Sequence, residues 1–325
     1  MRLSGIIILA GLSLVDTRVA VEPELAYSAF SSDGARHFDF WIGEWEVNLR
    51  TLQDDLTFRD WARAKASVYS ILGGKGILEL WDSKPIKGFS LRYYDSTSKQ
   101  WEVWIDWPEP NHSHLSSLEG GFRHGRGEFV DVSPGADGQV ITSVHSFSDV
   151  TPFSLRWEDR YSADNGKTWA RHREMEFTRS AVEPKWPLSR KSVPTYVDGG
   201  LCDEEHFRFE SLIGMWRGDA GSFIVLPVLD GCALIGFLDA VDGADEFVFH
   251  TFDSVEKQWV TAVLDDIPDT GLVRYLGEEW GDFNADGVGS VHWAVSRSGP
   301  GGIGTPGDVL VYQRGERVIK LTRVS

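Results

Sequence analysis

The sequence is poor in cysteine and in positive charge. Its only cysteines among 325 residues are Cys202 and Cys232, which excludes a small disulfide-scaffold protein. The spacing leaves open whether these two thiols form one bridge or stay free. Lysine and arginine number 32 against 49 aspartates and glutamates, which gives a net charge of −17. Because phosphate binding needs clustered positive charge, this balance argues against nucleic acid and anionic membrane surfaces as partners.

Long apolar runs and well-known catalytic motifs are also missing. No segment after the N-terminus approaches transmembrane length, so we expect no stable membrane insertion. The chain has no Gly-x-Ser-x-Gly elbow, no P-loop and no His-Glu-x-x-His motif. These absences leave open whether the protein is an enzyme, and they indicate no cofactor.

The first residues resemble an export signal. Met1-Arg2-Leu3 is a short basic start, and an apolar run of eleven residues follows from Gly5 to Val15. That run is too short to span a bilayer and has the length of a signal-peptide core. We therefore expect a signal peptide within residues 1–28, with an undefined cleavage site, and a secreted or periplasmic protein. An N-terminal strand or a membrane-tethering helix is the alternative.

Aromatic residues and glycine are abundant, and both favour β-structure. Fourteen tryptophans and 18 phenylalanines suit cross-strand packing, and 34 glycines suit tight turns. Segments with a two-residue polar–apolar period predict ten strands in the first half: Glu44–Leu49, Ala64–Ile71, Gly76–Trp81, Phe89–Tyr94, Trp101–Trp107, Ser116–Gly121, Gly127–Val132, Val140–Ser148, Ser154–Tyr161 and Trp169–Thr178. Short strands at regular spacing with turn signals between them indicate an antiparallel sandwich or barrel.

The second half repeats the landmarks of the first in the same order. Gly43-x-Trp45 recurs as Gly214-x-Trp216, and Asp95-Ser96-x-x-Lys99-Gln100-Trp101 recurs as Asp253-Ser254-x-x-Lys257-Gln258-Trp259. A proline-rich stretch separates the two copies. The sequence therefore predicts an internal duplication: a first barrel at 35–180, a linker at 181–204 and a second, shorter barrel at 205–325.

The first copy resembles a family of bacterial secreted proteins of unknown function. The resemblance rests on these segments: His37 to Trp45, Gly73-Gly74 before Glu79-Leu80-Trp81, Tyr94-Asp95 through Trp104, Gly120-Gly121-Phe122, and Ser162 to Trp169. It implies two all-β, calycin-like antiparallel barrels of about ten strands each, similar to lipocalins, fatty-acid-binding proteins and nitrobindin. Haem binding of the nitrobindin kind would need a histidine in a late strand. Residues 309–324 contain none, and His172 is the candidate in the first copy.

Three pairs of side chains form the candidate ligand site. In Trp101–Trp107, alternation places Glu102, Trp104 and Asp106 on one face of the strand. Glu79 with Trp81, and Arg156 with Glu158, show the same alternation. If these faces share one lumen, they line a charged, aromatic cavity, and we expect Glu79, Trp81, Glu102, Trp104, Arg156 and Glu158 to bind ligand. Ordinary barrel packing with a solvated face is the alternative.

Two further motifs lie in loops. His112 and His114 follow the fifth strand, and with Asp106 they would be the catalytic residues if the protein is an enzyme. A metal site there would need a third ligand such as Asp106, Glu119, His124 or His145, and because the sequence fixes none, we predict no metal. Ser162-x-Asp164-x-Gly166-x-Thr168-Trp169 matches the Asp-box pattern, which we interpret as a structural turn.

Three functions are compatible with these observations. The first is a binding protein that holds an apolar, amphipathic or sugar ligand in the aromatic-lined first barrel. The second is a cofactor-independent hydrolase, lyase or isomerase that uses carboxylate and histidine residues at the mouth of that barrel. The third is a structural or interaction protein with filled barrels. The missing catalytic motifs favour the first.

Overall fold

The computed structural model describes residues 27–83, 87–106, 116–135, 138–184, 202, 204–254, 256–266, 271–278, 282–285, 289–296 and 306–324. The predicted leader at 1–28 and the linker at 181–204 fall almost wholly outside these residues. Within the described residues, no helix has the length and apolar character needed to cross a membrane.

The first barrel closes from ten antiparallel strands, which confirms the predicted fold class. Its strands are β1 (Gly43–Leu52), β2 (Phe58–Ile71), β3 (Gly76–Ser83), β4 (Lys87–Asp95), β5 (Gln100–Asp106), β6 (Ser116–Arg123), β7 (Arg126–Pro134), β8 (Val140–Ser148), β9 (Ser154–Ser162) and β10 (Ala170–Ala181). Each strand pairs with its neighbour in sequence, and β10 returns to β1. Closure leaves no unpaired sheet edge, which suits a chain so rich in strands.

The second barrel repeats this up-and-down order. Its strands are β11 (Gly214–Gly218), β12 (Gly221–Val228), β13 (Ala233–Ala240), β14 (Glu246–Asp253), β15 (Gln258–Asp265), β16 (Val273–Gly277), β17 (Asp282–Ala285), β18 (Gly289–Ser296), β19 (Val309–Arg314) and β20 (Arg317–Arg323). The two barrels in tandem fit a calycin-like fold. The turns η4 (Leu72–Gly74) and η7 (Leu229–Gly231) occupy equivalent places, and both contain residues at positive φ.

A tryptophan–arginine contact closes one end of each barrel in the same way. In the first barrel the Arg179 guanidinium lies 4.1 Å from the centre of a Trp45 ring and donates to the backbone carbonyls of Ile42 and Phe40. In the second, Arg323 lies 4.2 Å from Trp216 and donates to the carbonyls of Ile213 and Ser211. The last strand of each barrel thus holds the helical turn that precedes its first strand.

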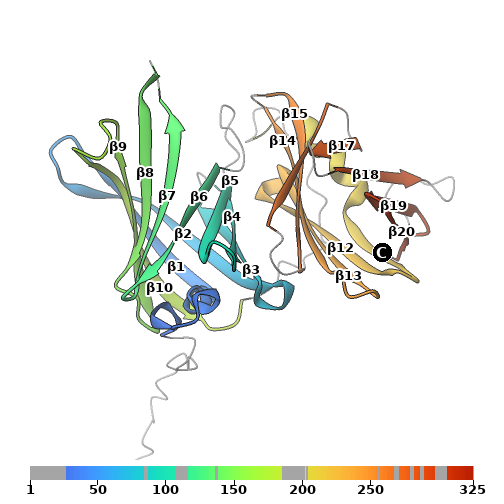
Figure 1. Cartoon of the computed structure of the whole chain (residues 1–325), viewed down its shortest axis with the longest axis horizontal. Coiled ribbons are helices and arrows are strands. Elements are labelled where there is room, and N and C mark those ends of the chain that lie inside the picture. The colour runs from blue at the N-terminus through green and yellow to red at the C-terminus, as the bar shows by residue number, and fades with distance from the viewer. Residues whose placement is uncertain are drawn as a thin grey trace, which may run out of the picture.

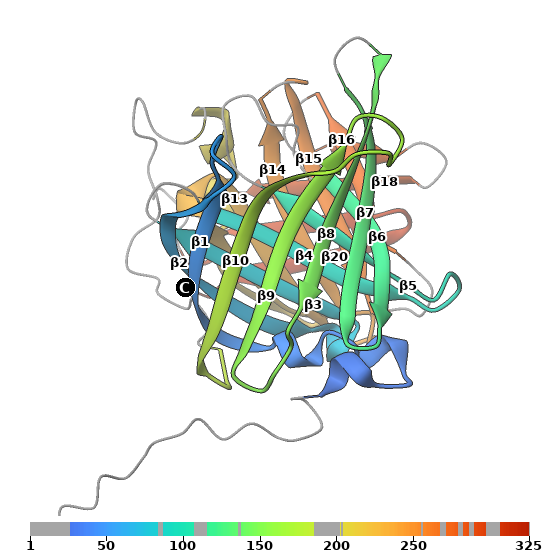
Figure 2. The same ribbon diagram turned by 90° about the vertical axis from the view of Figure 1, so that its left-hand side faces the viewer.

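Short helical turns cover the same end of the first barrel. These turns are η1 (Ser28–Phe30), η2 (Gly34–Arg36) and η3 (Asp39–Trp41), drawn in blue at the lower end of the barrel in Figure 2. Phe38, Phe40 and Trp41 are buried there against the rings of Trp101, Phe122 and Phe147. We call this the closed end, and we call the opposite end, where β5 and β9 finish, the mouth. In the second barrel, η6 (Glu204–Leu212) precedes the first strand.

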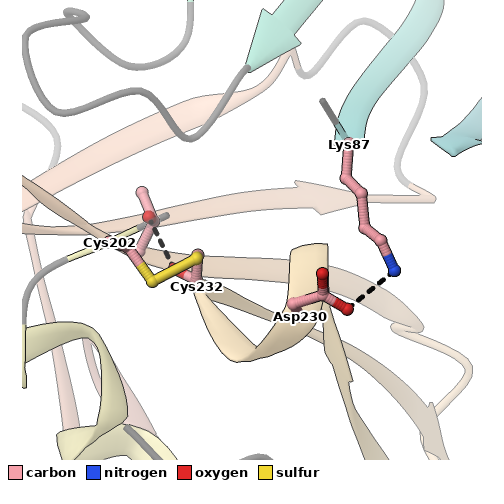
Figure 3. Close-up of a disulfide and its surroundings, with 5 residues drawn as sticks. Lys87, Cys202, Asp230 and Cys232 are labelled. Atoms are coloured by element: carbon pink, nitrogen blue, oxygen red, sulfur yellow. Dashed lines mark hydrogen bonds and ion pairs between the residues drawn. A yellow bond between two sulfur atoms is a disulfide. The ribbon is translucent and has the colours of Figure 1, made fainter. Parts of the chain in front are cut away.

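The two barrels pack side by side through the outer faces of their sheets (Figure 1). One apolar cluster combines Phe89 and Leu91 of β4 with Phe247 and Phe249 of β14, and the Phe89 and Phe249 rings stack at 4.5 Å. At its edge, Lys87 Nζ lies 2.7 Å from Asp230 Oδ1 in η7 (Figure 3). The outer faces of β4 and β14 are therefore as buried as a core.

The two cysteines form a disulfide, which decides the question that the sequence left open. Cys202 and Cys232 have Cα atoms 5.8 Å apart and close a separation of 30 residues (Figure 3). Cys232 is buried in the apolar cluster between the barrels, directly after η7. The bridge therefore fastens the segment before η6 to the turn that contacts the first barrel.

Candidate functional site

The lumen of the first barrel is closed at one end and accessible at the other. Strand register places Trp45, Val103, Phe147 and Phe177 inside the barrel near the closed end, and all four are buried. Inward residues nearer the mouth are only partly buried: Ile105, Ser143, His145, Trp157, Asp159 and Arg173. Exposure therefore rises along the lumen from the closed end to the mouth.

A cavity of about 50 Å³ lies deep in this lumen. Its walls include the rings of Trp41, Trp81, Phe147 and Trp157 and the side chains of Ile105 and Met175. Since a water molecule occupies roughly 30 Å³ in the liquid, the cavity has room only for one or two waters or for the end of a hydrocarbon chain. A larger ligand would extend from this cavity into the wider part of the lumen toward the mouth.

A buried ion pair forms the polar wall of the cavity. Arg92 Nη2 lies 3.0 Å from Glu79 Oε2, and both side chains are buried. The Ser90 hydroxyl joins them, accepting from Arg92 Nη1 at 2.8 Å and donating to Glu79 Oε2 at 2.7 Å. The guanidinium also lies 5.4 Å from a Trp41 ring. Burial lowers the pKa of Arg92, while the charge of Glu79 acts in the opposite direction.

His145 projects into the lumen with unused hydrogen-bonding capacity. Its ring meets the Trp157 ring edge-to-face at 5.0 Å, and its buried Nδ1 has no hydrogen-bond partner among the described residues. Burial inside the barrel, with the positive charges of Arg173 and Arg92, lowers the pKa of His145 to about 3. The imidazole is therefore neutral at physiological pH and presents one donor and one acceptor.

Asp159 and Arg173 lie next to His145, nearer the mouth. Asp159 faces His145 across the β8–β9 pair. The Asp159 carboxylate accepts from the backbone N–H of Arg173 at 2.6 Å and lies 3.4 Å from Arg173 Nε. A register shift in β10 between Arg171 and Glu174 lets the aspartate reach this backbone group.

Of the six predicted ligand-binding residues, Glu79 and Trp81 line the lumen cavity. Glu102 and Trp104 lie on the outer face of β5, which faces the second barrel. Glu102 accepts a hydrogen bond from the Tyr93 hydroxyl, and Trp104 packs against the apolar cluster between the barrels. Asp106 pairs with Phe89 on this same outer face and is buried.

Arg156 and Glu158 also lie outside the lumen. Arg156 Nη2 is 3.4 Å from Glu176 on β10, and Glu158 is 3.2 Å from Arg126 Nη2 on β7. The expectation that all three pairs share one lumen is therefore wrong. Its physical cause is the second barrel: because β5 is buried on both faces, aromatic residues occur on both, and alternation cannot tell inside from outside.

His112 and His114 fall outside the described residues. Among those that are described, no group of three histidine, cysteine, aspartate or glutamate side chains is arranged to hold a metal ion. Sequence reasoning did not select Arg92, Asp159 or Arg173, and it named His145 only as a distant metal ligand. Their signal was weak but present, because Arg92 and His145 are polar residues in phase with buried aromatics on their own strands.

The Asp-box segment is a structural turn, as predicted. Asp164 accepts from the Thr168 hydroxyl at 2.6 Å and from its backbone N–H at 2.8 Å. Gly166 has φ of 80° and donates to the Ser162 hydroxyl at 2.9 Å. The hydrogen bonds from Thr168 lower the pKa of Asp164 to about 2. These contacts fix the β9–β10 connection at the mouth.

The second barrel is filled by its own side chains. Its inward residues on β13, β14 and β15 are all buried: Leu234, Leu238, Val248, His250, Thr261 and Val263. At the end equivalent to the mouth, Arg314 Nη1 lies 3.2 Å from Glu246 and 3.1 Å from Asp265, and Arg317 Nη1 lies 2.8 Å from Glu246. The Tyr312 hydroxyl also donates to Glu246. This network occupies the space that is accessible in the first barrel.

His250 makes the second barrel sensitive to acid. It is fully buried, its Nδ1 lies 2.9 Å from the Thr261 hydroxyl oxygen, and burial lowers its pKa from 6.5 to about 3. Below pH 6.5 the unfolded chain takes up the proton and the folded chain does not, so stability is lost as the pH falls toward 3. We expect His250→Gln to remove about 2 kcal/mol of the stability difference between pH 7.5 and pH 5. Urea unfolding at both values measures this, and an unchanged pH dependence would refute the assignment.

The chain matches no model of a known protein family, and no curated protein matches it in sequence.

Proposed function

We propose that this is an exported protein that binds a small apolar or amphipathic molecule in the lumen of the first barrel. One observation carries the proposal: exposure rises along the first lumen toward the mouth, whereas the described inward positions on β13–β15 of the second barrel are all buried. In this proposal the second barrel is a structural support that packs against β4 and β5. Membership of the secreted family that the sequence resembles forms part of the same proposal.

The chemistry of the wall supports an apolar ligand over a sugar. The deep cavity is lined mainly by aromatic rings with Ile105 and Met175, and its polar groups, Glu79 and Arg92, already bind each other. Ligand pockets of this kind bury apolar surface and use a few polar groups to fix orientation. A sugar would need many hydrogen-bonding partners, and the described wall of the deep cavity has few.

Export is supported by two independent features. The apolar run from Gly5 to Val15 has the length of a signal-peptide core. The Cys202–Cys232 disulfide is the kind of bond that persists in oxidising compartments. The enzyme alternative loses support, because Asp106 faces away from the lumen and toward the second barrel.

The replacement Ile105→Trp tests whether the lumen is the binding site. Ile105 is a partly buried wall residue of the deep cavity, so a larger side chain there blocks the lumen with little strain on the buried core. We expect the variant to bind the neutral fluorescent probe N-phenyl-1-naphthylamine at least ~10-fold more weakly than the wild type, because one blocked contact region removes more than 1.4 kcal/mol of binding free energy.

The matched control is Val132→Trp, which adds the same ring on the exposed outer face of β7. We expect it to bind the probe as the wild type does. Native mass spectrometry of the protein purified from its own host, without detergent, then identifies any retained molecule. Equal probe binding by Ile105→Trp and wild type, or no binding by the wild type, would contradict the proposed function.

A further inference from the structure

Two side chains in the first lumen have free hydrogen-bonding groups that face the same space. Arg173 contacts Asp159 and His172 only through Nε, at 3.4 Å and 3.1 Å. Its two terminal nitrogens contact no polar group in the described part of the chain. His145 likewise has a ring nitrogen without a partner there. Arg173 is close enough to His145 for its charge to act on the imidazole.

The position of these two groups along the lumen sets the direction of a ligand. On β9, Leu155, Trp157 and Asp159 follow one another toward the mouth, and Asp159 pairs with His145. The aromatic wall of Trp157 thus lies on the deep side of His145, and Arg173 lies on the mouth side with Asp159. A molecule in this lumen would meet apolar surface first from the deep end and polar groups nearer the mouth.

The chemistry of these groups matches a carboxylate. The planar fork of a guanidinium binds the two oxygens of a carboxylate, and Asp159 contacts only Nε, which leaves the terminal edge of the fork available. A neutral imidazole adds one N–H donor beside it. A carboxylate in this place is also shielded from the net charge of −17 carried by the chain, because walls of apolar side chains surround it.

We propose that Arg173 and His145 bind the carboxylate of an apolar acid whose hydrocarbon part lies against Trp157 and Ile105 and ends in the deep cavity. The inference rests on the proposed function, since it names the ligand class of the same lumen. Arg173 and His145 thereby determine specificity, and Asp159 is a positioning residue that orients Arg173. Arg92 has a different role, because Glu79 and Ser90 already engage its terminal nitrogens.

Titration calorimetry with decanoate and decan-1-ol tests the inference, because the two probes share a chain length and differ in the charged group. We expect the wild type to bind decanoate at least ~10-fold more tightly than decan-1-ol, since a charge-assisted hydrogen-bonded pair contributes more than 1.4 kcal/mol. Arg173→Gln should abolish this preference and leave the affinity for decan-1-ol unchanged, which also shows that the variant folds. His145→Gln should reduce the preference in part.

The control is Arg171→Gln on the same strand, whose side chain lies on the outer surface 3.9 Å from Glu158. It should keep the full preference for decanoate. Equal affinity of the wild type for both probes, or a preference that survives Arg173→Gln, would overturn the inference and leave lumen binding intact. If neither probe binds while N-phenyl-1-naphthylamine does, the acid is wrong and the lumen is right. If none of the three binds, the proposed function fails as well.

Discussion

Replacing Glu79 with glutamine is expected to lower the free energy of unfolding by about 3–5 kcal/mol. Glu79 and Arg92 are both buried and form an ion pair at 3.0 Å inside the first barrel. The variant keeps a hydrogen-bonding group of the same size but leaves the guanidinium without a compensating charge. Urea titration of the variant and the wild type measures the difference.

Two further variants show whether the charge is the cause. Glu79→Leu combined with Arg92→Met removes both charges, and we expect it to recover most of the loss, because an apolar pair of similar volume often replaces a buried ion pair at little cost. Glu128→Gln breaks contacts with Arg126 and Arg160 on the exposed outer surface, and it should cost less than about 1 kcal/mol. A loss below 1 kcal/mol in Glu79→Gln would show that the pair is not buried as described.

Removing the disulfide is expected to cost about 3–4 kcal/mol. Cys202 and Cys232 are separated by 30 residues, and closing a loop of that length removes about this much conformational freedom from the unfolded chain. The pair Cys202→Ser with Cys232→Ser should show the loss in urea titration without reductant.

The wild type treated with dithiothreitol should become as unstable as the serine variant, and the serine variant should not respond to the reductant. A thiol assay of the unfolded wild type, without reductant, should find no free thiol. Two free thiols, or a serine variant as stable as the wild type, would contradict the bridge and would remove one of the two supports for export.

The barrels could be predicted from sequence because their signals are local or repeated. Each of the ten strands of the first barrel has a two-residue period and ends at turn residues, so its existence follows from a short window. The duplication was visible in Gly43-x-Trp45 and Gly214-x-Trp216, which the structure places in equivalent contacts with Arg179 and Arg323. Tertiary context did not override these patterns.

The site was harder to predict because it depends on which face of each strand points inward. Trp104 faces outward and is covered by the second barrel, so its strand carries large side chains on both faces. Arg173 and His145 lie on different strands, and nothing in the sequence states that β8 and β10 present side chains to one lumen at the same height. Such a site becomes visible only when strand register and barrel closure are known.

The most direct test of the central claim is a crystal structure with bromododecanoic acid, in which the anomalous signal of bromine locates the hydrocarbon end of the ligand. The account predicts a bromine peak in the first lumen on the deep side of Trp157, with the carboxylate at Arg173 and His145. It predicts no peak inside the second barrel. A peak in the second barrel or only on the outer surface, or a ligand with its carboxylate at the closed end, would contradict it.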